Sequence, residues 1–490
     1  MALPGRGSSS RPSGRSSPRA SSAPSSSSST ACSTSSCRAT SSRKPSPDAS
    51  PTFPDAWRAC CRPALGRRGR RPVSASAPLV GPCEALLAPR LEQRILPGLE
   101  RVHAALAALG HPERSLRSVL VVGTNGKGST AALLASILTA HGLRVGLTTS
   151  PHLVRVEERI RVDGAPIATA RLQTLLRSLQ QFPELSYFET LTVAAIMEFA
   201  AGGVDVAVLE AGLGGRWDAS NAFPPAVSLL TNVGTDHQAW LGPTRRHIAA
   251  EKAAALRGYE AIVGNWDGEV EGVIRDTASA PLSLASDWAS VTLLASPGEG
   301  CQHVAFRLGG VAGTAELPLE GDFQQDNLRL ALAGAAALAR HGLLPRLDAG
   351  ALARGIAATR WPGRLDRREH GGRRFLLDGA HNREAVAALA SHLAARRLPE
   401  LDLVFSCLAD KPLAAMAELL RPWVRRVTVV ELPSPRATPA SELARAFPGC
   451  RTAPSVAEAL AGARAASTTL VTGSLRLVGE ALAWLEANHE

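Results

Sequence analysis

Lysine is scarce in this chain. Of 54 basic residues only four are lysines, namely Lys44, Lys127, Lys252 and Lys411. Arginine therefore supplies positive charge wherever charge alone is needed. A retained lysine is a candidate for chemistry that needs a flexible primary amine, which guanidinium cannot replace. On this ground we single out Lys127, Lys252 and Lys411 as candidate functional residues.

Cysteine pairs of the C-x-x-C type are also lacking. The eight cysteines contain no C-x-x-C pair, and half of them fall before residue 62. Neither a disulfide framework nor a zinc site is indicated, which favours a reducing cytoplasm. The chain also has no uncharged apolar run of about 18 residues and no secretory signal, so we expect no membrane partner.

Acidic residues are rare only at the start of the chain. Residues 1–77 hold 13 Lys+Arg and 2 Asp+Glu, whereas the remainder holds 41 of each, so the net charge of +11 resides entirely in this tail. The neutral body argues against a nucleic-acid partner. The tail is rich in Ser, Arg and Pro, and its composition predicts disorder. It is either an organelle transit peptide or translated sequence upstream of the true start, and we favour the second interpretation.

The segment around Lys127 predicts a phosphate site. Val119–Val122 is a run of apolar residues typical of a buried parallel strand, and a glycine-rich loop and a helical sequence follow it. Such a loop lets backbone N–H groups and a helix N-terminus approach an anion. The pattern departs from G-x-x-x-x-G-K-[ST], because Val121 stands in place of the first glycine and Gly128 separates Lys127 from Ser129. An ordinary strand-to-helix turn is the alternative.

Strands alternate with helices along the rest of the chain, which favours a doubly wound α/β fold. In the first half we expect a broken helix over 86–109 and further strands at 144–149, 204–209 and 226–231. Strands alternate with helices again in the second half, where we expect strands at 375–377, 403–405, 427–430 and 469–471. The sequence predicts a disordered tail (1–77), a parallel-sheet domain that contains the phosphate loop (84–358), a linker (359–366) and a smaller α/β domain (367–490).

Two candidate metal ligands follow strands of the first domain. Glu210 ends one predicted strand and offers the hard oxygen that Mg²⁺ prefers, whereas His237 follows the next strand and is less typical for that ion. Taken singly, Glu210 could instead cap a helix and His237 could be a hydrogen-bonded loop residue. Their joint placement beside the phosphate loop favours a metal–nucleotide site.

Five motifs together resemble the folylpolyglutamate synthase/dihydrofolate synthase family, a branch of the ATP-dependent Mur ligases. They are Val122-Gly-Thr-Asn-Gly-Lys-Gly-Ser-Thr130, Thr149-Ser-Pro-His152, Glu210-Ala-Gly-Leu-Gly-Gly-Arg216, Asp236-His237 and Asp378-Gly-Ala-His-Asn382. The resemblance covers roughly residues 84–490. It implies a P-loop domain and a Rossmann-like domain with the active site between them. It also implies that ATP phosphorylates a folate-type carboxylate and that L-glutamate attacks the acyl phosphate, which releases ADP and phosphate.

The resemblance assigns roles residue by residue. The ATP set is Thr124, Asn125, Gly126, Lys127, Gly128, Ser129, Thr130, Asn327, Arg364 and Asp378. The Mg²⁺ ligands are Ser150, Glu210, His237 and Lys252, and the resemblance implies that Lys252 is carbamylated. Two Mg²⁺ sites are therefore expected. A monovalent cation is a further candidate cofactor. The catalytic candidates are Lys127, Lys252 and His381, although no individual role is fixed for His381 or Lys411.

The pterin pocket is the part where the chain departs most from the family pattern. The resemblance places Ser186, Tyr187, Phe188, Glu189, Trp217, Asp218 and Ala219 there. A stacked Phe ring and a Glu that accepts pterin N–H bonds suit that ligand. Trp217 replaces a smaller aliphatic residue, Ser220 replaces a Thr, and Arg383 replaces a Pro. The first two bear on the fit of the pterin.

Three other functions were weighed. Another Mur-type ligase acting on a non-folate carboxylate is the nearest alternative. A P-loop switch is disfavoured, because a GTPase needs the tetrapeptide N-K-x-D, which the chain lacks. A binding module would not need a second lysine at the metal site. We therefore expect a ligase that adds glutamate to dihydropteroate, to folates or to both. By resemblance it is a monomer whose partners are small-molecule substrates.

Overall fold

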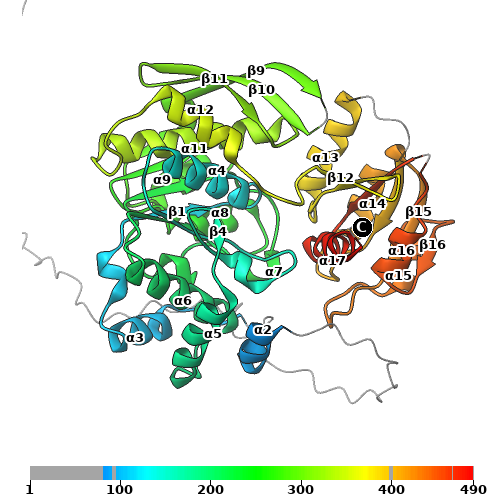
Figure 1. The fold of residues 1–490 in the computed structure, drawn as a ribbon, viewed down its shortest axis with the longest axis horizontal. Helices are drawn as coiled ribbons and strands as arrows, with labels where there is room; N and C mark the ends of the chain where they lie inside the picture. The colour runs from blue at the N-terminus through cyan, green and yellow to red at the C-terminus, as the bar shows by residue number, and fades with distance from the viewer. Residues whose placement is uncertain (1–80, 91–94, 299, 397–400, 466, 489–490) are drawn as a thin grey trace, which may run out of the picture. The chain divides into compact units, whose positions relative to one another are not determined.

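The computed structural model describes residues 81–90, 95–298, 300–396, 401–465 and 467–488. The predicted tail (1–77) lies outside the described residues. Within the described part, the chain forms two α/β regions, each built on a sheet, and a small antiparallel sheet (Figure 1). No helix in these ranges is both long and apolar enough to cross a membrane.

The first region is built on an eight-stranded sheet with the order β4-β3-β2-β5-β1-β6-β7-β8. Its strands are β1 (Ser118–Val122), β2 (Val145–Thr148), β3 (Ile160–Val162), β4 (Ala165–Pro166), β5 (Val206–Glu210), β6 (Val227–Leu230), β7 (Glu260–Val263) and β8 (Leu282–Leu284). Neighbours from β2 to β8 pair in parallel, and β3 and β4 add an antiparallel edge. Val121 of β1 pairs with Glu210 of β5 on one side and with Leu229 of β6 on the other. The loops that follow these three strands therefore leave the sheet at the same edge.

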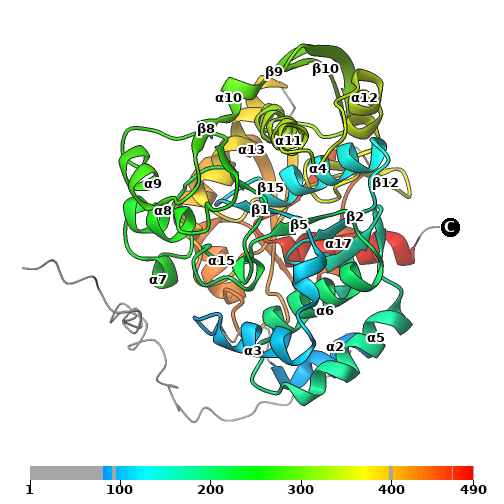
Figure 2. The ribbon, with the colours of Figure 1, turned by 90° about the vertical axis from the view of Figure 1, so that its left-hand side faces the viewer.

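Helices cover both faces of this sheet (Figure 2). One face of β1 carries Leu120 and Val122, in a core shared with α3 (Glu100–Ala108), α5 (Thr169–Ser178), α6 (Tyr187–Ala201), α8 (Arg245–Ala253) and α9 (Glu271–Thr277). The other face carries Val119 and Val121, in a core shared with α4 (Lys127–Ala140), α11 (Phe323–Arg340) and α12 (Ala349–Ala358). Burial on both faces explains why β1 is apolar throughout.

Two parts of the first region differ from the sequence prediction. The broken helix expected over 86–109 is α2 (Pro82–Leu87), a 3-10 turn (Ala88–Arg90) and the separate α3. The prediction also contained no strand between residues 260 and 320, where β7, β8 and an antiparallel sheet lie. That sheet consists of β9 (Ala289–Gly298), β10 (Cys301–Leu308) and β11 (Val311–Leu317), and it packs on α11 and α12. Two short helices, α7 (Gln238–Leu241) and α10 (Ala285–Trp288), complete the region.

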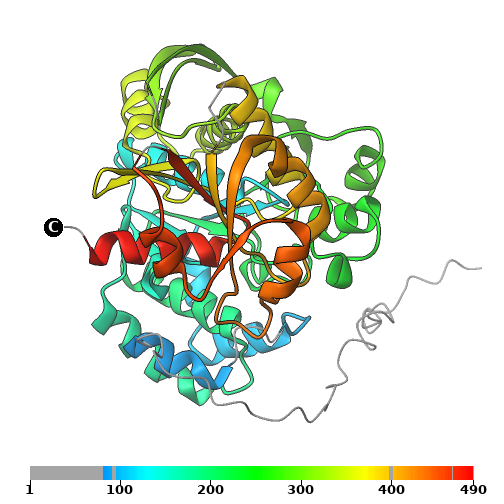
Figure 3. The same ribbon diagram turned by 90° about the vertical axis from the view of Figure 1, so that its right-hand side faces the viewer.

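The second region is a six-stranded sheet with the order β12-β13-β17-β14-β15-β16. Its strands are β12 (Asp366–His370), β13 (Arg373–Leu377), β14 (Leu401–Phe405), β15 (Val424–Val430), β16 (Arg451–Ala453) and β17 (Thr468–Thr472). Only β12 runs antiparallel to its neighbour. One face packs on α13 (Arg383–Ala395), α14 (Leu413–Leu420) and α15 (Ala440–Ala446), and the other on α16 (Val456–Ala461) and α17 (Leu475–Ala487) (Figure 3). The four strands predicted for this half are confirmed.

Candidate active site

A cavity of about 760 Å³ opens where the loops of the two regions meet. It is lined by nearly all the residues that the sequence singled out: Thr124, Asn125, Gly126, Lys127, Gly128, Ser129, Ser150, Ser186, Tyr187, Phe188, Glu189, Glu210, Trp217, Asp218, Ala219, His237, Asn327, Arg364, Asp378 and His381. Two predicted residues, Thr130 and Lys252, are buried behind it. Parallel sheets bind ligands at this edge because their strand ends and loops converge there.

The glycine loop after β1 is held by the loop after β6. The backbone N–H of Asn125 donates to the Asn232 side chain at 3.1 Å, and the Thr231 hydroxyl donates to the carbonyl of Asn125 at 2.7 Å. Helix α4 then begins at Lys127, whose ammonium donates to the carbonyl of Thr124 at 3.2 Å. The loop is thus fixed before any ligand binds, with a helix N-terminus at its end.

Two glycines of this loop are required by close neighbours. Gly126 has φ +83°, and a Cβ there would lie 2.3 Å from the Asn327 side chain, which brings α11 against the loop. A Cβ on Gly128 would lie 2.7 Å from the indole of Trp361. The extra glycine that separates this loop from the usual P-loop pattern therefore makes room for a tryptophan close to Arg364.

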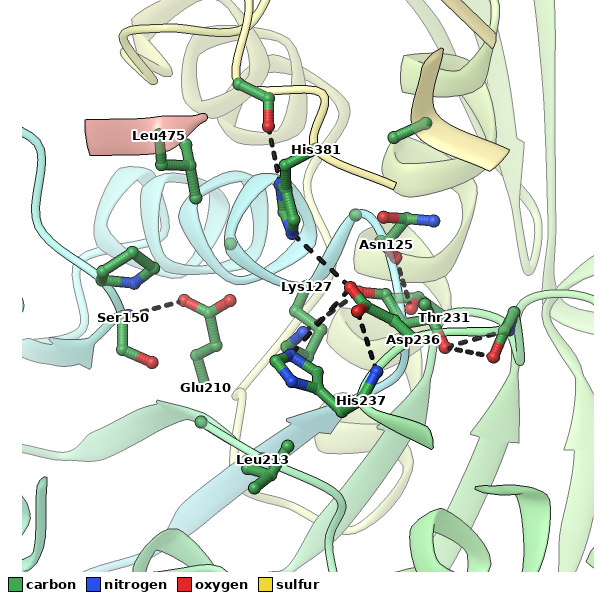
Figure 4. Close-up of a pocket in the computed structure, with 18 of the residues that line it drawn as sticks. Asn125, Lys127, Ser150, Glu210, Leu213, Thr231, Asp236, His237, His381 and Leu475 are labelled. Atoms are coloured by element: carbon green, nitrogen blue, oxygen red, sulfur yellow. Dashed lines mark hydrogen bonds and ion pairs between the residues drawn. The ribbon is translucent and has the colours of Figure 1, made fainter. Parts of the chain in front are cut away.

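Glu210 and Ser150 meet at the ends of β5 and β2. The backbone N–H of Ser150 donates to a carboxylate oxygen of Glu210 at 2.9 Å (Figure 4). Burial raises the pKa of Glu210, and the nearby Lys127 opposes that rise. A buried carboxylate beside a hydroxyl supplies the oxygen donors that Mg²⁺ prefers, so this pair fits the ion.

Lys252 lies on α8 beneath the phosphate loop. Its side chain is 4% exposed and donates to the carbonyl of Gly123 at 2.6 Å. Burial, and next the charge of Lys127, lower the pKa of Lys252 to about 7. A large part of this lysine is therefore a neutral amine near neutral pH.

Asp236 is the centre of a polar network that joins the two regions. Its carboxylate accepts hydrogen bonds from the Lys411 ammonium at 2.6 Å and from the Asn382 amide at 3.1 Å. Asn382 also exchanges hydrogen bonds with Asn125 of the phosphate loop, at 2.9 and 3.3 Å. Burial alone would raise the pKa of Asp236, but the surrounding charges hold it well below its usual value. The second region thus contacts the phosphate loop and the neighbour of His237 directly.

Two histidines flank this aspartate. Figure 4 shows Asp236 between the rings of His381 and His237, and their Nε2 atoms lie 3.6 and 4.0 Å from its carboxylate. Burial and nearby lysines lower the pKa of each histidine to about 4. Both rings are therefore neutral at pH 7, so each can offer a lone pair to a ligand.

Arg364 and Asp378 form the floor of the cavity on the side of the second region. Burial lowers the pKa of Arg364 and raises that of Asp378, and each partly offsets the effect on the other. The Asp378 carboxylate accepts the backbone N–H groups of Leu365 and Ala380, both at 2.9 Å. Asp378 therefore fixes the loops that carry Arg364 and His381.

Another part of the cavity lining, which we call the aromatic end, is rich in aromatic side chains. Tyr187, Phe188 and Trp217 line it together with Asp218, which accepts the backbone N–H of Leu213 at 2.8 Å. Glu189 lies at the start of α6 and is engaged by Arg101 of α3 at 2.7 Å. We predicted that Glu189 accepts pterin N–H bonds, whereas the structure shows its carboxylate already bonded within the protein.

Several residues of this site had no assigned role in the sequence prediction. Asp236 and Asn382 stood inside recognised motifs, and the scarcity of lysine pointed to Lys411. Arg101 had no signal, because one arginine among so many is uninformative. Its contact with Glu189 spans 88 residues and appears only in the folded chain.

Comparison with known proteins decides the family. Residues 121–335 match the Mur ligase middle domain, and residues 363–475 match the Mur ligase glutamate ligase domain. The dihydrofolate synthase/folylpolyglutamate synthase of Mycobacterium tuberculosis is 36% identical over 72% of this chain and 78% of that protein. The chain belongs to the folylpolyglutamate synthase/dihydrofolate synthase family. Members of this family are ATP-dependent ligases that form a C–N bond between glutamate and folates.

Solved structures of this family share the fold. A Mycobacterium tuberculosis folylpolyglutamate synthase complexed with ADP has a TM-score of 0.75 and 34% identity, covering 82% of this chain and 97% of that one. E. coli FolC in complex with DHPP and ADP has a TM-score of 0.72 and 31% identity, covering 83% and 98%. A bifunctional folylpolyglutamate synthase/dihydrofolate synthase with Mn, AMPPNP and L-glutamate bound has a TM-score of 0.71 and 29% identity, with the same coverage.

Some relatives are longer than this chain. The probable bifunctional folylpolyglutamate synthase/dihydropteroate synthase of Haloferax volcanii is 36% identical over 79% of this chain but only 48% of its own length. The chain therefore spans about half of that relative, and the similarity says nothing of the other half.

Proposed function

We propose that this ligase joins L-glutamate to dihydropteroate and to reduced folates through an acyl phosphate. A carboxylate oxygen attacks the γ-phosphorus of ATP, and ADP leaves. The glutamate amine then attacks the acyl carbon, loses a proton and expels phosphate, which leaves an amide. A carboxylate is too poor an electrophile without this activation. The protein's part is to hold the reactants and neutralise charge.

One observation carries this proposal. A single cavity of about 760 Å³ joins a phosphate loop, a buried carboxylate for a cation and a group of aromatic side chains. A nucleotide switch would need the first of these but not the aromatic end. The second region adds Lys411 and Arg436, which line the same cavity and pair with Asp236 at 2.6 Å and Asp410 at 2.9 Å, respectively.

At the phosphate end, Lys127 and the backbone N–H groups of the loop bind the outer phosphates. Arg364, Asn327 and Asp378 complete the ATP set that we propose. Ser150, Glu210 and His237 would hold Mg²⁺, and Lys252 a second ion. When bound, Mg²⁺ supplies charge neutralisation for the phosphoryl group. His381 stays a catalytic candidate as a neutral hydrogen-bonding ring at Asp236.

We propose that Lys252 is carbamylated. Only an uncharged amine adds CO₂, and the low pKa of Lys252 leaves a neutral amine near pH 7. The carbamate would turn a buried cation into an oxygen ligand. The ¹³C NMR spectrum of the protein in ¹³C-bicarbonate is expected to contain a carbamate signal that Lys252→Arg removes. A signal that survives this substitution would place the carbamate on another amine.

At the aromatic end, Phe188 and Trp217 are expected to stack on the pterin, with Ser186, Tyr187, Asp218 and Ala219 around it. The likeness to FolC bound to DHPP supports this pocket as the pterin site. The alternative is a non-folate carboxylate. We also propose that the chain acts as a monomer in the cytoplasm, an organelle being the alternative if the tail is a transit peptide.

The function is tested by product analysis. The full chain is incubated with ATP, Mg²⁺ and L-glutamate, with dihydropteroate or tetrahydrofolate in separate reactions, and products are identified by mass. We expect ADP and a glutamylated product from both acceptors. A product from one acceptor alone would refute the dual activity. ATP binding without a product from either acceptor would refute the folate assignment.

A further inference from the structure

Helix α3 and helix α6 lie side by side, as Figures 1 and 2 both show. Arg101 on α3 reaches Glu189 in the first turn of α6. Its Nη2 lies 2.7 Å and its Nε 3.1 Å from Oε1 of Glu189. The Glu189 side chain is buried and that of Arg101 is 22% exposed. Nε also lies 3.3 Å from Oε2, so two guanidinium nitrogens contact both oxygens of this carboxylate in a charge-assisted pair.

Glu189 has a second partner within its own helix. Its Oε2 accepts the backbone N–H of Ser186 at 2.7 Å, while the Ser186 hydroxyl accepts the backbone N–H of Glu189 at 3.3 Å. This reciprocal capping box fixes the start of α6, where Tyr187 and Phe188 follow. Each carboxylate oxygen of Glu189 therefore already accepts a hydrogen bond from the protein.

The same guanidinium holds a second wall of the cavity. Nη2 of Arg101 donates to the carbonyl of Leu96 at 2.8 Å and lies 3.2 Å from the carbonyl of Gly98. Ile95, Leu96 and Pro97 line the same cavity as the α6 residues Tyr187 and Phe188. One side chain thus ties the segment of residues 95–98 to the helix that carries Tyr187 and Phe188.

We propose that Arg101 is a positioning residue that sets the folate end of the cavity, and that Glu189 acts through Arg101 rather than by binding the pterin. Removing the guanidinium frees both walls and leaves Glu189 buried without its partner. The acceptor substrate should then bind more weakly, while ATP, at the other end, should be unaffected. This inference rests on the proposed function only for the identity of the acceptor.

The chain offers a matched control. Arg171 of α5 pairs with Glu198 of the same helix α6 at 2.6 Å, and neither residue lines the cavity. Arg171→Met removes an arginine–glutamate pair from α6 without touching the proposed site. An effect that follows from loosening α6 in general would appear in both Arg171→Met and Arg101→Met.

Steady-state kinetics test the inference. In Arg101→Met, KM for dihydropteroate is expected to rise about tenfold, with KM for ATP unchanged, since a charge-assisted contact is lost. Arg101→Lys should recover part of the loss, and Arg171→Met should match the wild type. The double variant Arg101→Met/Glu189→Gln should be no worse than Arg101→Met. An additive double variant would mean that Glu189 contacts the substrate directly, and an unchanged KM in Arg101→Met would refute the positioning role.

A second measurement needs no turnover. Hydrogen exchange of the ligand-free protein should be faster in residues 95–98 and 186–189 of Arg101→Met than in Arg171→Met. Equal exchange in the two variants would overturn the inference. A wild type that releases no ADP with any folate would instead contradict the proposed function, and the exchange data would still decide the role of Arg101.

Discussion

The two ends of the cavity are built in different ways. The phosphate end is built mainly on one continuous segment, residues 123–129, which comprises the glycine loop and the first turn of α4. Hydrogen bonds from the loop after β6 and from the second region hold this segment in place. The folate end is assembled from three separate segments, around residues 95–98, 186–189 and 217–219. Charged groups are expected to bind the substrate at the phosphate end, whereas aromatic side chains are expected to bind it at the folate end.

This difference predicts how each end responds to substitution. Charges that bind a transferring phosphoryl group act on the transition state, so that their loss lowers kcat. Aromatic contacts act equally on the bound substrate and the transition state, so that their loss raises KM. Three of the four substitutions below test this division and one tests a contact outside both ends, in order from the largest expected effect to the smallest.

Lys127→Met removes the cation at the start of α4. We expect kcat for ADP release to fall by about 10²–10³-fold, the loss typical of one preorganised group at a developing charge. Thermal unfolding should change little, because within the described part of the chain Lys127 donates one hydrogen bond, to the carbonyl of Thr124 at 3.2 Å. A variant that lost affinity for the folate acceptor while keeping kcat would break the division between the two ends.

Glu320→Gln affects neither end and should lower stability instead. Glu320 is 1% exposed and pairs with Arg367 at 2.8 Å and with His392 at 3.2 Å, which links the antiparallel sheet to the second region. Burial would raise the pKa of Glu320, but its hydrogen bonds to His392 and Arg367 lower it to about 2. That shift corresponds to about 3 kcal/mol of unfolding free energy.

The stabilisation that Glu320 provides is expected to depend on pH in one direction. Because the folded-state pKa of Glu320 is depressed, its contribution is complete above the unfolded pKa and is lost as pH falls towards about 2. Chemical denaturation should therefore show the full difference between wild type and Glu320→Gln at pH 7. The difference should shrink below about pH 4.5. A difference that grows on acidification would contradict this account.

Gly128→Ala tests the contact between the phosphate loop and Trp361. The added Cβ would lie 2.7 Å from the indole, so the loop must shift. We expect KM for ATP to rise about tenfold, as for overpacking by a small group. Gly128→Ala/Trp361→Leu should recover part of this loss in the same assay, because the ring is gone. No recovery would mean that Gly128 is needed for its backbone alone.

Phe188→Leu should have the smallest effect. Loss of one stacked ring is expected to raise KM for dihydropteroate by about three- to tenfold, with kcat and KM for ATP unchanged. Tyr259→Leu is the matched control, since Tyr259 is an exposed aromatic residue outside the cavity. If Phe188→Leu mainly lowered kcat, the folate end would also act on the transition state.

The same difference explains what the sequence could predict. The phosphate loop, Glu210 and His237 follow strands that short apolar runs in the sequence predict. In the structure all three line the same cavity, as expected. Lys411 could be predicted as a functional residue only because lysine is so scarce in this chain. The contact of Arg101 with Glu189 joins residues 88 positions apart, and that of Asn382 with Asn125 joins residues 257 positions apart. No local sequence pattern predicts contacts at such separations. The antiparallel sheet at 289–317 was missed because the described side chains of β9 are mostly exposed, β11 alternates exposed with half-buried residues, and neither strand has a strong apolar signal.

Isotope transfer tests the central claim most directly. Dihydropteroate labelled with ¹⁸O in its carboxylate is incubated with the full chain, ATP, Mg²⁺ and L-glutamate, and the released phosphate is analysed by mass. An acyl-phosphate route requires one ¹⁸O to pass from the carboxylate to phosphate for each amide formed. Amide formation with no ¹⁸O in the phosphate would contradict the account.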